Sequence, residues 1–227
     1  MRVLSAHFRM AEPSSNAPAA AAPPRGGFPV GVLYVVFCLS GLAAILYQLI
    51  WQRALFALLG IDSVSVSLIV AAFLLGLGLG ALAGGALSKK LHRLPLLFAG
   101  LELGIGAFGL VSLPFFRWMA GWSIGAEGLT VGLVAFAAVI IPTLLMGATL
   151  PVLVAHTVRA SGNVGRSVGA LYFVNTIGSA AGCALAGGFL FGALGMSGSV
   201  YVAAALNALV AIVVLAMNAA ARRGERA

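Results

Sequence analysis

A few polar side chains stand inside long apolar stretches of this sequence, where their burial needs a chemical reason. Glu102 is the clearest, because it lies in the run LELGIGAFGL, and an acidic residue at bilayer depth is a functional candidate by default. Such a carboxyl group either pairs with a neighbour, binds a proton or contacts a cation. It therefore indicates either a proton or amine site or a structural hydrogen bond between membrane spans.

Three more polar residues are predicted at related depths. At 1.5 Å per helical residue, Glu102 lies about 12 Å and Asn175 about 10 Å below the cytoplasmic surface. Thr143 falls near the same level, and Asn207 lies close to the midplane. We predict that Glu102, Asn175, Thr143 and Asn207 form a polar layer that binds substrate.

The apolar run that contains Thr143 also contains two prolines. Pro142 and Pro151 each remove a backbone hydrogen bond, so we predict that they kink or break their helix. Freed carbonyls can then line a polar site, as in interrupted transporter helices. The alternative is a purely structural kink.

Other reactive constellations are missing from the sequence. No His, Cys, Asp or Glu cluster has metal-ligand spacing, and no Ser-His-Asp or Cys-His arrangement stands out. We therefore expect no metal, no cofactor and no catalytic residue.

The composition indicates a protein of the lipid bilayer. Of 227 residues, 62% are hydrophobic and 8% are charged, against about 25% charged in soluble domains. The net charge of +8 comes from short basic clusters between apolar runs, which is typical of membrane topology and not of a nucleic-acid-binding face. The partner implied is lipid, with no nucleic acid.

Six apolar runs each approach the ~20 residues that span a bilayer as a helix. We predict an all-α polytopic membrane protein with six transmembrane helices inside a domain at 28–219. A disordered cytoplasmic tail is expected at 1–27, rich in Ala, Pro and Ser, and a basic cytoplasmic tail at 220–227. The spans are placed at 30–52, 63–87, 95–116, 129–153, 168–192 and 198–219.

Basic residues predict the orientation of these spans. With a cytoplasmic N-terminus, eleven of the 13 Lys and Arg residues fall inside, and only Arg53 and Arg117 fall outside. This bias places both termini in the cytoplasm. The cytoplasmic turn after the second span is marked by Lys89, Lys90 and Arg93.

Glycines at a four-residue spacing predict close helix packing. Gly76, Gly80 and Gly84 share one face of the second span, and Gly178 and Gly182 share one face of the fifth. Small residues let membrane helices approach closely. We expect both spans to be central and tightly packed.

An internal similarity links these two spans. ALAGGALSKKL at 81–91 aligns with ALAGGFLFGAL at 184–194, an offset of 103 residues. That offset maps the second span onto the fifth, which crosses in the opposite direction, as a 3+3 inverted repeat requires. The alternative is coincidence in a sequence rich in Ala, Gly and Leu.

The end of the first span carries Tyr47, Gln48, Trp51, Gln52 and Arg53. We interpret this group as an interfacial aromatic belt with a snorkelling arginine.

Five stretches together resemble the transmembrane region of bacterial spermidine-synthase-like membrane proteins, which is similar to half a major facilitator. The resemblance covers nearly all of 30–219. The stretches are YQLIWQR (47–53), GLGLGALAGGAL (76–87), LELGIGAFGL (101–110), IPTLLMGATLPVL (141–153) and VGRSVGALYFVNTIGSAAG (164–182).

The resemblance implies an inner-membrane, transporter-like module that binds or passes a small, polyamine-like molecule. The family's aminopropyltransferase domain has no counterpart in this sequence, so no enzymatic activity is implied. The family usually has an acidic residue where Ser88 or Lys89 stands here, which weakens any gating role for that turn. A six-span half-facilitator implies a homo-oligomer. The alternative is an accessory membrane subunit that anchors a separate soluble enzyme or belongs to a larger complex.

Overall fold

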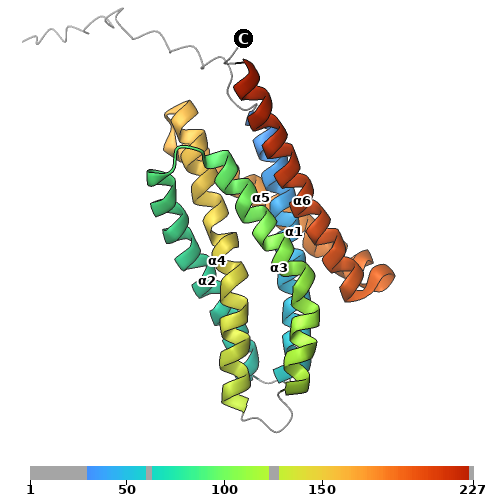
Figure 1. Ribbon diagram of the computed structural model, residues 1–227. Coiled ribbons are helices and arrows are strands. Elements are labelled where there is room, and N and C mark those ends of the chain that lie inside the picture. The colour runs from blue at the N-terminus through green and yellow to red at the C-terminus, as the bar shows by residue number, and fades with distance from the viewer. Residues whose placement is uncertain (1–29, 60–62, 123–127, 225–227) are drawn as a thin grey trace, which may run out of the picture.

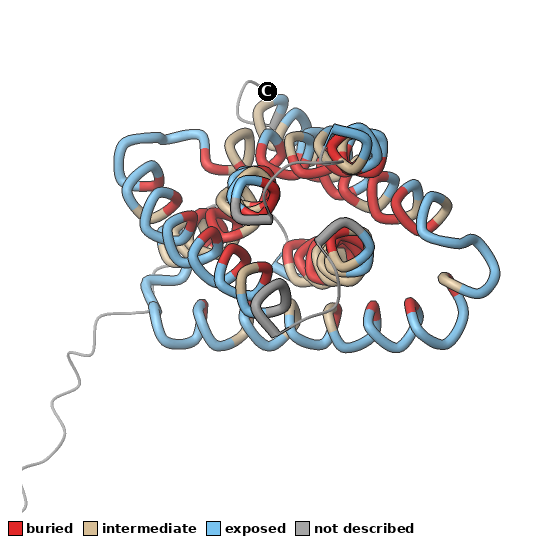
Figure 2. Tube along the Cα trace, turned by 90° about the horizontal axis from the view of Figure 1, so that it is seen from below, coloured by how far each residue is buried: buried red, intermediate tan, exposed pale blue. Residues whose placement is uncertain are grey.

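The computed structural model describes residues 30–59, 63–122 and 128–224, and within these ranges it is entirely helical apart from short connections. The elements are α1 (Val30–Leu59), α2 (Ser63–Lys90), α3 (Leu94–Trp122), α4 (Gly128–Ser161), α5 (Val164–Leu185), the π-helical turn η1 (Ala186–Leu190) and α6 (Phe191–Gly224). The long helices lie side by side in one bundle, with buried residues on their inward faces (Figures 1 and 2).

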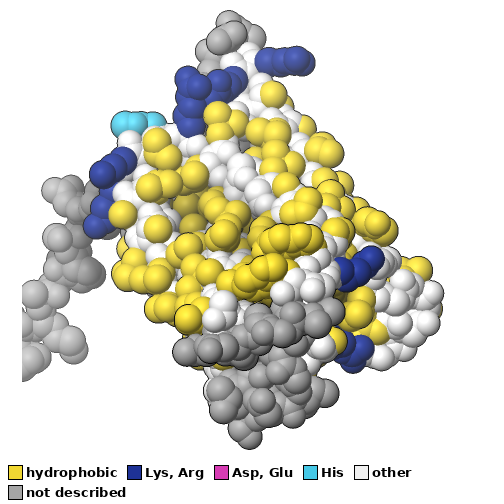
Figure 3. All heavy atoms as spheres, turned by 60° about the horizontal axis from the view of Figure 1, so that its bottom comes forward, with side chains coloured by type: hydrophobic (Ala, Val, Ile, Leu, Met, Phe, Trp, Pro, Cys, Tyr) yellow, Lys and Arg dark blue, Asp and Glu magenta, His cyan; other side chains and the backbone are white. Residues whose placement is uncertain are grey.

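Five described segments are long and apolar enough to cross a membrane. They are Val30–Ala57, Ser67–Lys90, Leu94–Trp122, Thr130–Ser161 and Val164–Arg223. Figure 3 shows a broad hydrophobic face with Lys and Arg side chains toward its edges. These properties are those of a membrane protein.

The last of these segments does not run straight. It covers 60 residues, but Gly195 inside α6 has φ 65° and ψ −172°, in the left-handed region that favours glycine. The chain turns back between α5 and the long C-terminal part of α6 (Figure 1).

The helices extend beyond the predicted span ends. α3 continues to Trp122 and α4 to Ser161, and 220–224 of the predicted basic tail belong to α6. The predicted tail at 1–27 lies outside the described residues. The predicted breaks at Pro142 and Pro151 do not occur, because α4 is helical through both prolines. One missing N–H per proline is outweighed by the other backbone bonds and by the packing of α4 on α2.

Each glycine-rich helix packs on a different partner. α2 packs along α4, and α5 packs along α1; α3 packs along α6. α1 also contacts α6, and α3 contacts α4, whereas α2 and α5 barely touch each other. The expectation that α2 and α5 are central is therefore wrong, since each covers one side of the bundle.

The predicted glycine faces are the contact surfaces. A Cβ at Gly80 would lie 2.9 Å from Leu144 Cα, and one at Gly84 would lie 2.7 Å from Ala148 Cα, both on α4. Gly76 lies against Thr143. On the other side, Gly178 lies against Cys38 and Gly182 against Leu42 and Ile45, all three on α1. These glycines allow the backbones to approach closely.

The aromatic residues at the end of the first span are buried, so the interpretation as an interfacial belt is wrong. Tyr47 and Trp51 are each 0% exposed, and their rings stack with centroids 5.1 Å apart. Trp51 Nε1 donates to Ser112 Oγ of α3 at 2.9 Å. Tyr47 fits because Gly109 of α3 has no side chain at that point. The pair joins α1 to α3 inside the bundle.

The basic turn after α2 is joined to the end of α4. Lys89 and Lys90 form the last turn of α2. The guanidinium of Arg159, in the last turn of α4, donates to the carbonyls of Ser88 at 2.5 Å and Leu91 at 3.3 Å. Cations near a helix C-terminus satisfy its free carbonyls and oppose its dipole.

Candidate functional site

The predicted carboxylate lies at a junction of three helices. Glu102 on α3 is 0% exposed. Ser40 Oγ on α1 donates to its Oε1 at 2.6 Å, and Asn207 Nδ2 on α6 donates to its Oε2 at 2.6 Å. Gly106, one turn along α3, leaves room for Asn207, because an added Cβ would lie 3.3 Å from Asn207 Cβ. We call Glu102, Ser40 and Asn207 the polar junction.

The hydrogen bonds occupy both oxygens of Glu102. Ser40 Oγ and Asn207 Nδ2 each donate to one of them, and an ionised carboxylate can accept both bonds. The Asn207 amide therefore presents Nδ2 to Glu102, and its Oδ1 is buried without a hydrogen-bond partner among the described residues. A buried polar atom in this condition needs an explanation.

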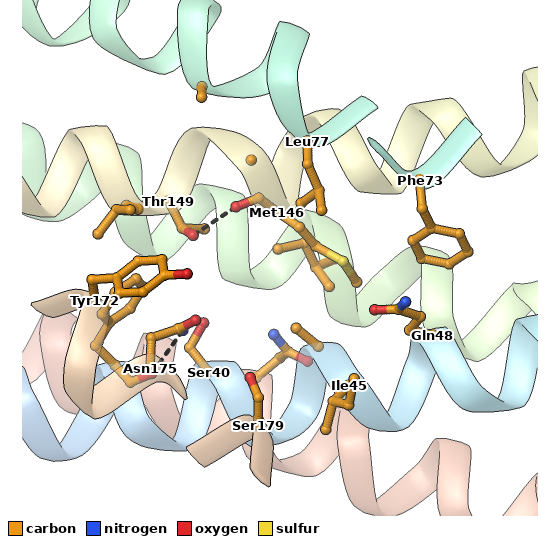
Figure 4. A pocket seen from close by; sticks show the side chains of 17 residues that line it. Ser40, Ile45, Gln48, Phe73, Leu77, Met146, Thr149, Tyr172, Asn175 and Ser179 are labelled. Atoms are coloured by element: carbon orange, nitrogen blue, oxygen red, sulfur yellow. Dashed lines mark hydrogen bonds between the residues drawn. The ribbon is translucent and has the colours of Figure 1, made fainter. Parts of the chain in front are cut away.

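A cavity of about 350 Å³ lies beside the junction, and Ser40 and Asn207 are part of its wall. The rest of the wall comes mainly from α1, α2, α4 and α5 (Figure 4). Its polar side chains are Ser40, Gln48, Thr149, Tyr172, Asn175, Ser179 and Asn207, and the others are apolar or glycine. This volume is within the range of small-molecule sites.

The structure brings together three of the four residues predicted for the polar layer. Glu102 bonds directly to Asn207. Asn175 lines the same cavity, and its Nδ2 donates to the Phe37 carbonyl at 3.3 Å. Asn175 can pack this close to α1 because Gly41 faces it.

Thr143 lies elsewhere. It is 0% exposed and packs against Gly76 at the contact of α2 with α4. Its hydroxyl donates to the carbonyls of Val139 at 2.8 Å and Ile140 at 3.0 Å within its own helix. Thr143 is thus satisfied locally and is not part of the cavity wall.

Sequence reasoning missed Ser40. A signal was present, since Ser40 is an isolated hydroxyl in an apolar run, ten residues after Val30, which is about 15 Å along a helix. That depth is comparable to the depth expected for Glu102. Ser179, which donates to the Gly41 carbonyl at 3.1 Å, was also missed.

The described residues contain no group of three or more His, Cys, Asp or Glu side chains that could hold a metal ion. The polar junction itself has one carboxylate and two neutral side chains that donate to it, which is fewer oxygen ligands than Ca²⁺ or Mg²⁺ takes. The arrangement instead suits a ligand that carries a positive charge and N–H donors.

Comparison with known proteins returns nothing: no family model, no curated protein and no solved structure matches this chain.

Proposed function

We propose that this protein is a non-catalytic, transporter-like membrane module that binds a small organic cation in the cavity and passes it across the bilayer. The observation that carries this proposal is the position of Asn207: this residue lines the cavity, its Nδ2 donates to the buried Glu102, and its Oδ1 is buried without a hydrogen-bond partner among the described residues. An ammonium N–H donates to Oδ1, and the carboxylate behind it opposes the positive charge.

The proposal includes six spans in a 3+3 inverted repeat. The 60-residue segment from Val164 crosses twice, with the reversal at Gly195. In such a repeat, α1, α2 and α3 of the first half correspond to α4, α5 and α6 of the second half. The contact of α2 with α4 then corresponds to the contact of α5 with α1, and the contact of α3 with α4 corresponds to that of α6 with α1. All four contacts are present, which supports the repeat.

Matching glycines support the same repeat. Gly76 and Gly80 face α4 as Gly178 and Gly182, 102 positions later, face α1. The sequence alignment of 81–91 with 184–194 gives an offset of 103, which differs from the glycine offset by one residue.

The proposed orientation has both termini in the cytoplasm of a bacterial inner membrane. It is supported by the eleven basic residues on one side of the predicted topology against two on the other. The resemblance to spermidine-synthase-like membrane proteins makes spermidine one of the first cations to test.

Glu102→Gln tests the proposal in proteoliposomes with radiolabelled amines, including spermidine and hexylamine. The change removes the charge and keeps the shape. Asn207 can rotate to accept from the new amide, which removes its free acceptor from the cavity. We expect binding and uptake of every amine that the wild type takes to fall about ten- to a hundredfold.

Thermal unfolding of the same samples separates lost binding from lost structure. A folded Glu102→Gln variant with unchanged uptake would contradict the proposal. The accessory-subunit alternative predicts instead a stoichiometric partner after purification in mild detergent, and no amine uptake by the purified wild type.

A further inference from the structure

We propose that the ligand of this cavity is a monoamine with an apolar body, and that it enters from within the bilayer through a mouth between α2 and α5. This inference rests on the proposed function, in which the cavity binds a cation, and it narrows the cation to one chemical class. It also differs from the polyamine-like ligand implied by the sequence resemblance.

The charge of the site favours one ammonium group. Glu102 is the single acidic residue among those the structure describes, and Asn207, which donates to it, has an Oδ1 atom that is buried without a hydrogen-bond partner among the described residues. One ammonium at Oδ1 gives a neutral pair with the carboxylate. A second or third ammonium in the same cavity would meet only neutral groups such as Gln48 and Thr149, and a buried charge without a counter-charge is costly.

The remainder of the wall suits an apolar body. Phe73 and Leu77 of α2, Met146 of α4 and Ile45 of α1 form the part of the cavity away from Ser40 and Asn175 (Figure 4). Gln48 is the polar exception there. An alkyl chain or an aromatic ring would bury apolar surface against this wall, which contributes about 0.8 kcal/mol for each CH₂ removed from water.

The mouth lies at the depth of the bilayer. Leu77 on α2 and Tyr172 on α5 both line the cavity, yet they are 38% and 63% exposed. α2 and α5 make almost no contact with each other, and both residues lie within segments apolar enough to cross a membrane. An amine with an apolar body concentrates in the bilayer and can enter this mouth directly from the lipid.

The test compares three probes on the full-length protein in phosphatidylcholine nanodiscs. Equilibrium dialysis measures binding of radiolabelled hexylamine, hexanol and spermidine, and empty nanodiscs correct for partition into lipid. We expect hexylamine to bind at least about tenfold more tightly than hexanol, since one charge-assisted hydrogen bond is worth about that factor. We expect a preference of at least about the same size over spermidine, because burying its further ammonium groups without a counter-charge is costly. Asn207→Ala should weaken hexylamine binding by about the same factor and hexanol binding by less, because the alcohol makes only a neutral hydrogen bond to Oδ1.

The outcomes separate this inference from the proposed function. Spermidine binding equal to or tighter than hexylamine binding would overturn the monoamine assignment and leave cation binding intact. No binding of either amine to folded wild-type protein would overturn both. If Asn207→Ala does not fold, the ranking of the three probes on the wild type decides the question alone.

Discussion

Gly80→Ala is expected to destabilise the protein, whereas Gly78→Ala, two residues earlier in the same helix, is expected to stabilise it. A Cβ at Gly80 would lie 2.9 Å from Leu144 Cα and closer still to the Leu144 carbonyl oxygen. Backbone cannot move aside as a flexible side chain can, so α2 and α4 must separate. Overpacking of this kind costs about 1–3 kcal/mol.

Gly78 provides the matched control. A Cβ there meets nothing within 4 Å, so only the helix propensity changes. Alanine is favoured over glycine in a helix by about 0.5–1 kcal/mol. Both variants gain this term, and the difference between them isolates the contact with α4.

Thermal unfolding in nanodiscs, followed by circular dichroism, measures both variants against the wild type. The unfolding temperature should fall for Gly80→Ala and rise slightly for Gly78→Ala. Equal shifts for the two variants would show that the close approach of α2 to α4 does not hold the bundle together.

The same glycines mark what sequence could predict about the fold. A four-residue spacing identifies one face of a helix, and Gly76, Gly80 and Gly178 do lie on the contact faces. Spacing says nothing about which helix fills the gap. The partner helices α4 and α1 were not predicted, because the residues that face the glycines, such as Leu144 and Cys38, belong to no recognisable sequence pattern.

The buried aromatic residues illustrate the same limit. Tyr47 and Trp51 near a span end are typical of a membrane interface. Here α1 is longer than the predicted span and continues to Leu59, which places both rings inside the bundle. Their burial depends on Gly109 and Ser112 of α3, and no local pattern in α1 encodes that contact.

For the site, sequence found the charge but not the geometry around it. Glu102 stood out because acidic residues are rare in apolar runs. Asn207 and Asn175 were grouped with it because their estimated depths in the membrane are related. Depth along a helix does not fix rotation about its axis. Thr143 has a suitable depth but packs against Gly76, away from the cavity, whereas Ser40 points to Glu102.

Removing both donors of the polar junction should be the most destabilising change at the site. The double variant Ser40→Ala, Asn207→Leu leaves the Glu102 carboxylate buried without either of its two 2.6 Å hydrogen bonds. Hydrogen bonds to a charged group are worth about 1.5–3 kcal/mol each. We expect the free energy of unfolding to fall by about 3–5 kcal/mol, measured by denaturant titration in mixed micelles.

Adding Glu102→Leu to that double variant should restore most of the lost stability. Replacing a buried charge together with its partners by apolar groups of similar size is often neutral or stabilising, because the cost lies in the unpaired charge. The triple variant would then fold without the charged group that binds the cation. A bundle that recovers stability and loses amine binding would assign the junction to ligand binding; a triple variant that stays as unstable as the double would mean that the junction chiefly fastens α1 and α6 to α3.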